Sequence, residues 1–501
     1  MVQRLLPALA PMPLWRREGQ RALEAWLQAR SSTPLMDLAG LSCARLALAL
    51  APHARCIWVL AGPGNNGGDG LEAAMHLHRW GLNVQVELLA KAEALPADAR
   101  RAWQRAQAAG VPIQQRTGPE LGPTPALGPQ DLCIDALLGL GASRAPEGLL
   151  RQAILALRQQ NAPVLAVDLP SGLDADSGQA LGAASATACA VRADHTLCLL
   201  AAKPGLWMGQ GRDLAGQLWL DTLGLSDTAP GLPAPDAWLN HAPTPHARRH
   251  ASHKGSHGDV AVVGGERAGA DSSMTGAALL AAQAALQGGA GRVMLSLLGP
   301  TGGHSIAPEL MCRALPDLAL AELTVVAGCG GGRAIAQPLG LLLQRSARLV
   351  LDADGLNRLA EDPWLQDLLR ARAQRRQPTV LTPHPLEAAR LLGCSTAQVQ
   401  ADRLQAAQAL ATRYASVVVL KGSGTVVAAR GQTPRINPTG NGLLATGGTG
   451  DVLAGLLGAR LAGGHEAWAA ACDAVWTHGQ AADDWPPGQA LTASALAKGL
   501  R

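Results

Sequence analysis

The chain has 501 residues, a formal net charge of +4, and 48% hydrophobic against 16% charged residues. At about 150 residues per domain, this length predicts two or three domains. The high apolar content excludes an intrinsically disordered protein, and the near-neutral charge gives no general attraction to nucleic acid or to an anionic membrane. The aromatic content is unusual, because the chain has 12 Trp and 1 Tyr but no Phe. This points to a restricted amino-acid alphabet or to deliberate substitution.

The 9 cysteines are scattered, and no pair has the CxxC spacing. This odd, dispersed set predicts reduced thiols rather than a disulfide framework or a zinc site. No apolar run approaches the ~18 residues that a membrane span needs. The N-terminal stretch is interrupted by prolines and reaches Arg16 and Arg17 too early for a signal peptide. We therefore expect a cytoplasmic protein without nucleic-acid or membrane partners.

Short apolar runs alternate with helix-like stretches in the first part of the chain. The expected strands are 56–61, 83–89, 131–138, 164–169 and 195–200, and the expected helices include 71–80 and 97–109. This alternation predicts a parallel sheet with helices on both faces. Between 226 and 249, Pro, Ala and turn residues follow no period, which predicts a linker between a domain over 1–225 and a second one.

The alternation restarts after the linker. The expected strands are 259–263, 292–297, 323–327, 348–351, 379–381 and 416–420, and helical stretches include 274–287, 385–392 and 451–461. We therefore expect a second α/β domain over 250–501, which is long enough to fold by itself.

A glycine-rich loop, GPGNNGGDG at 62–70, follows a strand and precedes a helix. Its glycines allow the backbone to approach a ligand closely, and amides at a helix N-terminus favour phosphate. The spacing matches neither the dinucleotide fingerprint nor a Walker A loop. A tight turn is the simpler explanation, but two adjacent Asn and Asp69 are more polar than a turn requires, which favours a binding loop.

Two further strand ends carry acidic residues, in IDALLGLGASR (134–144) and VDLPSGLDADSG (167–178). Carboxyl ends of parallel strands converge on one crevice. We therefore expect Asp135, Asp168, Asn66 and Ser171 to meet there as an acid/base group and hard oxygen ligands. Such ligands suit an alkali or alkaline-earth cation rather than zinc. The alternative is that Asp168 and Ser171 only cap the next segment.

Together with LMDLAG (35–40) and AAKPGL (201–206), these motifs resemble the NAD(P)HX epimerase domain of bifunctional NAD(P)H-hydrate repair enzymes. The resemblance covers most of 1–225 and implies a Rossmann-like three-layer domain. It implies Asp168 as catalytic acid/base and a potassium ion (K⁺) held by Asn66, Asp135 and Ser171. The implied substrate-binding residues are Asn65, Asn66, Gly67, Gly68, Asp69, Gly139, Leu140, Gly141, Ala142, Ser143, Arg144, Ala145 and Asp168.

In the second domain, GGTGD (447–451) precedes a helix of small residues. Its amides would face a transferring phosphoryl group, and Asp451 would deprotonate a hydroxyl. Close packing is an alternative explanation for the glycines at this helix start. It does not require an acidic residue at position 451, so the acid favours the catalytic interpretation. In VVVLKGSGT (417–425), a buried strand is followed by a loop that begins with Lys-Gly, which favours a phosphate contact. His384, between two prolines, is either a ligand contact or structural.

Two acids, Asp352 and Asp354, follow a further strand in LVLDADGLN (349–357). They either orient magnesium-bound phosphate through water or cap the next helix. With HKGSHGDVAVVGG (253–265), MTGAALLAAQAAL (274–286) and TPHPLEAARLLG (382–393), this half resembles the ADP-dependent NAD(P)HX dehydratase domain, which has a ribokinase-like fold. The resemblance covers nearly all of 250–501.

The resemblance implies phosphorylation of the C6 hydroxyl by ADP with Mg²⁺, followed by loss of phosphate to restore NADH or NADPH. The implied substrate contacts are Ala277, Gly332, His384 and Asp451, with Asp451 catalytic. The implied nucleotide-binding residues are Lys421, Gly422, Ser423, Gly424, Thr425 and Gly450. We expect NADHX, NADPHX and ADP as the small-molecule partners, and a homo-oligomer. The family usually has rings where this chain has His257, Met274 and Ala388, so apolar packing differs while the polar chemistry is retained.

Two other functions remain open at this point. One is a ribokinase-like kinase for a small alcohol, with a first domain that only binds. The other is an interaction scaffold, against which Asp168, Asn66 and Asp135 argue.

Overall fold

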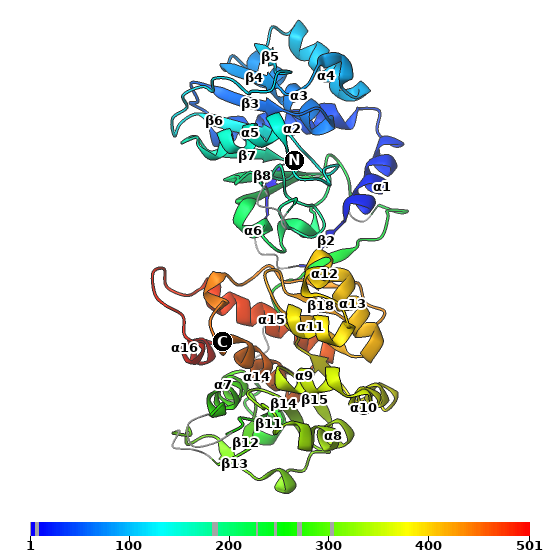
Figure 1. Cartoon of the computed structure of the whole chain (residues 1–501), viewed down its shortest axis with the longest axis vertical. Helices are drawn as coiled ribbons and strands as arrows, with labels where there is room; N and C mark the ends of the chain where they lie inside the picture. The colour runs from blue at the N-terminus through cyan, green and yellow to red at the C-terminus, as the bar shows by residue number, and fades with distance from the viewer. Residues whose placement is uncertain are drawn as a thin grey trace. The chain divides into compact units, whose positions relative to one another are not determined.

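The computed structural model describes residues 2–5, 10–182, 189–226, 229–244, 248–267, 273–300 and 305–500. The chain divides into two compact units, which consist mainly of Pro13–Ala237 and Trp238–Arg501 (Figure 1). Each unit contains a sheet whose strands alternate along the chain with helices. Over the described ranges, no helix has the length and apolar character needed to cross a membrane.

The sheet of the first unit has the strand order β1-β9-β8-β7-β6-β3-β4-β5 and is parallel from β9 to β5, with β1 antiparallel at its edge. The strands are β1 (Gln3–Arg4), β3 (Ile57–Ala61), β4 (Val84–Leu88), β5 (Ile113–Gln115), β6 (Leu132–Ala136), β7 (Val164–Val167), β8 (His195–Leu199) and β9 (Gln217–Asp221). A short strand β2 (Met12–Leu14) precedes the helices α1 (Arg17–Gln28), α2 (Leu35–Leu50), α3 (Asn65–Arg79), α4 (Ala97–Ala108), α5 (Gly148–Arg158) and α6 (Gly211–Leu214).

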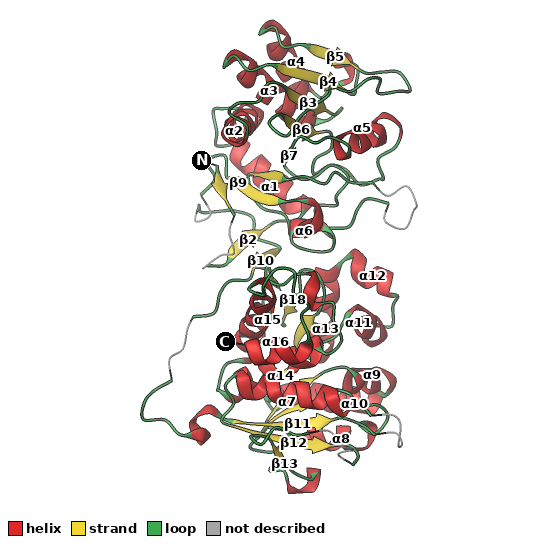
Figure 2. Ribbon diagram, turned by 90° about the vertical axis from the view of Figure 1, so that its left-hand side faces the viewer, coloured by secondary structure: helices red, strands yellow, loops and turns green. Residues whose placement is uncertain are grey.

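Alternate residues of strand β3 pack into two different cores. Ile57 and Val59 belong to a buried cluster with residues of α2, α3 and α4, whereas Trp58 and Leu60 belong to a cluster with residues of α5. Figure 2 shows α2 and α5 on opposite sides of β3, β6 and β7. Because both faces of the strand are buried, its sequence is a continuous apolar run. The first unit therefore has three layers, with helices on both faces of the sheet.

The sheet of the second unit is mixed. In the order β13-β12-β11-β14-β15-β16-β17-β18-β19-β10, neighbours are parallel except that β18 is antiparallel to β17 and β19. The strands are β10 (Ala237–Leu239), β11 (Asp259–Gly264), β12 (Arg292–Leu297), β13 (Met311–Cys312), β14 (Thr324–Ala327), β15 (Arg348–Leu351), β16 (Thr379–Leu381), β17 (Val417–Leu420), β18 (Val426–Ala428) and β19 (Arg435–Ile436).

Helices cover both faces of this sheet as well. Val260 and Val262 of β11 pack with residues of α7, α14 and α15, while Ala261 and Val263 are buried on the opposite face. Figure 1 shows α7 and α14 on one side of β11 and β14, and α8 on the other. The helices are α7 (Thr275–Gln287), α8 (Ala336–Arg345), α9 (Asp354–Glu361), α10 (Pro363–Gln374), α11 (Pro385–Leu392), α12 (Thr396–Ala401), α13 (Arg403–Tyr414), α14 (Thr449–Ala462), α15 (Ala467–Asp483) and α16 (Ala493–Gly499).

The cores are filled without phenylalanine. Ala, Leu and Val dominate the buried clusters, and the four largest fully buried side chains are Trp58, Arg372, Tyr414 and Lys203. Small residues bring helices α7 and α14 close together, because a Cβ on Gly455 would meet the carbonyl oxygen of Ala281 at 2.0 Å. Close backbone approach thus replaces the volume that aromatic rings usually supply.

Most predicted elements lie near their predicted bounds, and two differences are informative. Helix α3 begins at Asn65, so much of the predicted loop 62–70 is the first turn of a helix. The segment 226–249, predicted as a linker, contributes strand β10, which pairs with β19. Both differences depend on tertiary contacts, since Gly67 of α3 packs against the Gly62 carbonyl and β10 pairs with β19.

Candidate functional site

A cavity of about 720 Å³ lies in the first unit where strands β7 and β8 end. Its polar lining comes from separate elements and includes Glu24 of α1, Asn65 and Asp69 of α3, and Asp168 after β7. Apolar residues complete the wall: Leu35, Met36, Ala39, Leu199, Leu200 and Leu223. A concave, partly apolar space with a few convergent polar groups is typical of a small-molecule site.

Asp168 forms a buried ion pair with Lys203. The Lys203 side chain is fully buried, and its Nζ donates to Asp168 Oδ1 and, at 3.1 Å, to the carbonyl oxygen of Leu199. The Leu199 amide also donates to Asp168 Oδ1, at 3.3 Å. Asp168 has a φ of +69°, which costs a non-glycine residue energy and is found mainly where surrounding structure imposes it. These contacts hold the Asp168 carboxylate in a fixed position at the cavity wall.

Asp69 faces the same cavity in different surroundings. Burial raises the pKa of Asp69 well above its usual range, and the carboxylates of Asp168 and Glu24 raise it further. Burial, followed by the charge of Asp168, also raises the pKa of Glu24. The cavity therefore places Asp168, which pairs with a lysine, beside a carboxyl group with a raised pKa, and a raised pKa suits general acid catalysis.

Asp135 and Ser171 meet as predicted, in a fully buried position. Ser171 donates to Asp135 through its hydroxyl at 2.6 Å and through its amide at 2.8 Å, and the Leu137 amide donates at 3.2 Å. Burial raises the pKa of Asp135 to about 6, and these hydrogen bonds oppose the rise. The carboxylate has about four lone-pair sites, so one remains for a further ligand.

Asn66 lies nearby, and its side chain lines the loop at 139–145. A Cβ on Gly139 would approach the Asn66 side chain at 3.1 Å, and the buried Asn66 Nδ2 has no hydrogen-bond partner among the described residues. Amide, carboxylate and hydroxyl oxygens are suitable ligands for a hard cation. The chemistry of this donor set therefore fits K⁺, although the carboxylate of Asp135 is largely engaged.

The predicted glycines of this region have a packing role. A Cβ on Gly67 would meet the Gly62 carbonyl oxygen at 2.0 Å, and a Cβ on Gly68 would meet the Ala99 Cα at 2.8 Å. Their small size lets α3 approach the end of β3 and helix α4. In the loop Gly139–Ala145, the carbonyl of Ala142 accepts a hydrogen bond from Arg17 at 2.8 Å.

In the second unit, three neighbouring strands place polar side chains together. Asp352 follows β15, Thr382 follows β16 and Lys421 follows β17. Thr382 Oγ1 and Lys421 Nζ both donate to Asp352 Oδ1, each at 2.6 Å. Asp352 is nearly inaccessible, and its carboxylate raises the pKa of Lys421 against the effect of burial. The convergence that parallel strands predict is thus observed.

Asp451 faces this group from the first turn of α14. Ligand atoms of Cys329, Asp352 and Asp451 lie within 4.8 Å of one another. Burial raises the pKa of Asp451 to about 7, with Asp352 adding to the rise and Lys421 opposing it. A Cβ on Gly450 would lie 3.5 Å from Lys421 Nζ, so the amide end of the helix adjoins the lysine. A carboxyl group near neutral pKa beside a cation and a helix N-terminus suits proton abstraction next to a bound phosphate.

His384 caps helix α11. Its Nδ1 accepts from the amides of Leu386 at 3.1 Å and Glu387 at 3.3 Å, so the ring proton is on Nε2, 3.2 Å from Glu387 Oε1. Burial and the charge of Lys421 lower the pKa of His384. Burial raises the pKa of Glu387 to about 7. The structural role that the sequence left open is thus present, and the exposed edge of the ring is still accessible to a ligand.

The loop after β17 rests on a buried arginine. Arg403 donates to the carbonyl oxygens of Leu420, Lys421 and Gly424 at 3.2, 3.3 and 3.4 Å. Gly422 has a φ of +139°, and a Cβ there would meet Arg403 Nη1 at 2.8 Å. Burial lowers the pKa of Arg403 to about 10, so it stays charged at neutral pH. The guanidinium therefore fixes the carbonyl groups of this loop, and the Lys421 amide donates to the carbonyl oxygen of Pro383 at 2.9 Å.

The Gly330–Gly332 loop packs against Ala277, which lies in the first turn of helix α7. A Cβ on Gly330 would meet the Ala277 Cβ at 2.9 Å, and the Gly332 amide donates to Asp354 Oδ2 at 2.8 Å. Gly332 has a φ of +53°, a region that favours glycine. Asp354 is the first residue of helix α9 and fixes this loop through the Gly332 amide.

The first of two family models that match the chain, described as YjeF-related protein N-terminus, covers residues 32–205. The second, NAD(P)H-hydrate dehydratase, covers 260–500. The bifunctional NAD(P)H-hydrate repair enzyme Nnr of Escherichia coli is 38% identical over 90% of this chain and 84% of its own length. The chain belongs to the bifunctional NAD(P)H-hydrate repair enzyme family. The Coxiella burnetii enzyme is 37% identical over 90% of both chains.

Among solved structures, the ADP/ATP-dependent NAD(P)H-hydrate dehydratase of Bacillus subtilis is 29% identical, with a TM-score of 0.42, over 51% of this chain and 91% of its own. The family models and the curated relatives confirm the family predicted from the motifs, and the two parallel-rich sheets with helices confirm the α/β fold class. The small-alcohol kinase is not favoured, because the relatives that align with 90% of this chain are named bifunctional NAD(P)H-hydrate repair enzymes.

Several residues of this repair enzyme had no predicted role. Lys203 stands in the AAKPGL motif, and Arg403 opens α13 without any local signal. His478 is buried, its Nε2 is 2.9 Å from the carbonyl oxygen of Thr449, and burial lowers its pKa to about 4. Neutral His478 therefore donates to the first turn of α14, which carries Asp451.

Proposed function

We propose that the protein repairs hydrated NADH and NADPH in two steps. The first unit interconverts the R and S forms of NAD(P)HX, and the second removes water from the S form at the expense of ADP, yielding AMP and phosphate. One observation carries the second step. Asp451 has a pKa near neutrality and adjoins Lys421 at a helix N-terminus. A base, a cation and free backbone amides are the groups that phosphoryl transfer to a hydroxyl requires.

In the epimerase unit, Asp69 donates a proton to the C6 hydroxyl, which leaves as water. The electron pair of the ring nitrogen forms the C6–N double bond, and the resulting positive charge faces the carboxylate of Asp168. Water then adds to the other face of C6 and returns a proton to Asp69. We assign the proton transfer to Asp69, whose pKa is raised by burial, and the stabilisation of positive charge to Asp168, which pairs with Lys203, in place of the acid/base role that the resemblance implies for Asp168.

Around this cavity, we assign substrate contacts to Asn65, Asp69 and Asp168, and to the Gly139–Ala145 loop through its position beside Asn66. K⁺ would be held by Asn66, Asp135 and Ser171, and it would supply a fixed positive charge near the substrate phosphates. The one free lone pair on Asp135 and the oxygens of Asn66 and Ser171 support this assignment.

In the dehydratase unit, the C6 hydroxyl gives its proton to Asp451 as its oxygen attacks the β-phosphorus of ADP. AMP leaves with the electron pair of the broken P–O bond. The ring nitrogen then expels phosphate from C6, and loss of a C5 proton restores the nicotinamide ring of NADH or NADPH. Phosphate leaves readily where hydroxide does not, so the transfer step makes the elimination possible.

The nucleotide-binding residues we assign are Lys421, Gly422, Ser423, Gly424, Thr425 and Gly450, with Ala277, Gly332 and His384 toward the hydrated nicotinamide. Mg²⁺ with the nucleotide would neutralise phosphate charge, and the carboxylates of Asp352 and Asp451 are oxygen donors that fit it. Asp352 Oδ2 is the available oxygen, since Thr382 and Lys421 use Oδ1.

A coupled assay tests both steps. Purified protein with ADP and Mg²⁺ should convert S-NADHX to NADH, measured by absorbance at the NADH band, and should consume an R/S mixture completely. D451N should abolish dehydration while ADP still binds, and the control D367N, at an exposed position on α10, should behave as wild type. D69N should leave R-NADHX unconverted while S-NADHX is still dehydrated. Failure of wild-type protein to form NADH would exclude the dehydratase function.

We also propose a cytoplasmic location and a homo-oligomer. The 9 cysteines all have free thiols, and 6 of them are buried, which agrees with a reducing compartment. Sedimentation of the purified protein measures the oligomeric state.

A further inference from the structure

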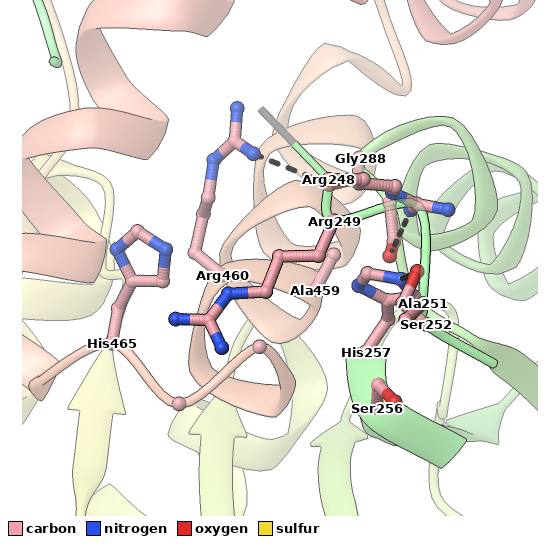
Figure 3. Close-up of a pocket in the computed structure, with 13 residues that line it drawn as sticks. Arg248, Arg249, Ala251, Ser252, Ser256, His257, Gly288, Ala459, Arg460 and His465 are labelled. Carbon is pink, nitrogen blue, oxygen red and sulfur yellow. Dashed lines mark hydrogen bonds between the residues drawn. The ribbon is translucent and has the colours of Figure 1, made fainter. Parts of the chain in front are cut away.

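A second cavity, of about 710 Å³, lies in the unit Trp238–Arg501 at a distance from the proposed dehydratase centre. Arg248, Arg249 and Arg460 line it, together with His257 and His465 (Figure 3). Arg460 belongs to α14, nine residues after Asp451, which corresponds to about 14 Å along the helix. The cavity is therefore separate from the groups assigned to dehydration.

Two of the arginines hydrogen-bond the end of helix α7. Arg248 Nη2 donates to the carbonyl oxygen of Gly289 at 2.6 Å, and Arg460 Nη1 donates to that of Gly288 at 3.3 Å. Each guanidinium carries five N–H donors, so capping this helix end uses a small part of their capacity. Burial lowers the pKa of Arg460, which means that its charge is partly removed from water. An anion in the cavity would compensate that charge.

Arg249 differs from the other two. Figure 3 shows its side chain extending across the cavity toward the turn between Arg460 and His465. No hydrogen bond or ion pair joins it to any other residue in the part of the chain that the structure describes. Its five donors are thus directed at the cavity and are available to a ligand.

The charge balance of the cavity is positive. Asp473 lies beside His465, with its Oδ2 3.5 Å from His465 Nδ1, and its charge raises the pKa of Arg460 against the effect of burial. The described residues that line the cavity include three arginines and no acidic residue. The rest of the wall includes the serines Ser252 and Ser256, which carry hydroxyls, and four glycines, which expose backbone: Gly288, Gly289, Gly463 and Gly464.

We propose that this cavity binds a phosphate-bearing small anion. Several guanidinium forks that approach from different directions match the tetrahedral oxygens of a phosphate better than the two coplanar oxygens of a carboxylate. The glycine walls let a ligand approach the backbone, and a volume of about 710 Å³ is of the size of small-molecule sites. The ligand is either a free phosphate or pyrophosphate or the phosphate group of a nucleotide.

Isothermal titration of the full chain with inorganic phosphate, pyrophosphate and AMP tests the proposal. We expect R249E to weaken binding of at least one of these probes by tenfold or more, since each hydrogen bond to a charged group that is lost costs about one factor of ten or more. R345A, which changes an exposed arginine at the end of α8, should bind all three as wild type. R249E should dehydrate S-NADHX at the wild-type rate, because Arg249 lies outside the dehydratase centre.

The three probes distinguish the source of the phosphate. Loss of phosphate and pyrophosphate binding alone in R249E identifies a free anion, whereas loss of AMP binding as well identifies a nucleotide. Arg249 has no partner in the described chain, so R249E is expected to fold, and its thermal unfolding curve checks this. Identical isotherms of R249E and wild type for all three probes, with both proteins folded, would overturn the proposal.

Discussion

Lys421 and Asp352 meet across an intervening strand. Lys421 follows β17, Asp352 follows β15, and Thr382 at the end of β16 donates to the same oxygen of Asp352 as the lysine does. A carboxylate that accepts two short hydrogen bonds, one of them from a lysine side chain, is held in a fixed position. Its remaining oxygen and its negative charge face Asp451, whose pKa they raise. This pair therefore sets both the nucleotide contact and the basicity of the proposed base.

The dehydratase rate should fall as the pH is lowered through about 7, because Asp451 has a pKa of about 7 and must lose its proton to act as a base. D352N removes a negative charge that raises this pKa, so the acid limb of the pH profile should move to lower pH. The measurement is kcat/KM for S-NADHX from pH 5 to 9. An acid limb at the same pH in both proteins would contradict the role of Asp352.

K421M should lower kcat/KM for ADP by a factor of about a hundred, since a hydrogen-bonded charge pair with phosphate contributes about 1.5–3 kcal/mol. It should also move the acid limb to higher pH, because the charge of Lys421 lowers the pKa of Asp451. Steady-state kinetics with varied ADP measures both effects. K498M, at an exposed position on α16, is the matched control. An unchanged Michaelis constant for ADP in K421M would rule out the phosphate contact.

K203M should destabilise the first unit by about 3–5 kcal/mol, because it leaves the buried carboxylate of Asp168 without its cation. The double variant D168N/K203M should recover part of this loss, since the amide carries no charge. Urea unfolding followed by hydrogen exchange at strands β7 and β8 measures the free energy. K91M, at an exposed position in the same unit, should leave it unchanged. Additive effects of the two substitutions would show that the residues are not coupled.

R403K should raise the Michaelis constant for ADP by about tenfold and leave that for S-NADHX nearly unchanged. Lysine keeps the charge but lacks the planar fork that reaches three carbonyls of the 420–424 segment. Kinetics with each substrate varied separately checks the split. R413K on the same helix, where the side chain contacts the Leu391 carbonyl, is the control. Equal rises for both substrates would indicate general unfolding rather than loop positioning.

Much of the fold could be predicted because its strands are continuous apolar runs. Both faces of β3 are buried, so IWVLA contains no polar residue and is bounded by a glycine. Helix α3 was predicted to begin too late, because its first turn is rich in glycine and asparagine. Those residues are tolerated there since Gly67 must pack against the carbonyl of Gly62, a contact that local propensity does not encode.

The properties of the candidate sites also fall into those that the sequence predicts and those that depend on tertiary contacts. The amino-acid sequence by itself determined which residues stand at strand ends and helix starts, and so predicted Asp135, Asp168, Lys421 and Asp451 as site residues. It also determined the family, because motifs in a fixed order are read directly along the chain. These properties depend only on residues that are neighbours in the sequence, so the sequence alone predicts them.

Only the tertiary structure decided how the surroundings of these groups shift their pKa values. Lys203 pairs with Asp168, burial and the neighbouring carboxylates raise the pKa of Asp69, and burial together with Asp352 raises the pKa of Asp451. Each of these effects joins residues from different elements. Protonation depends on desolvation and on charges a few ångströms away, and both arise when distant parts of the chain pack together.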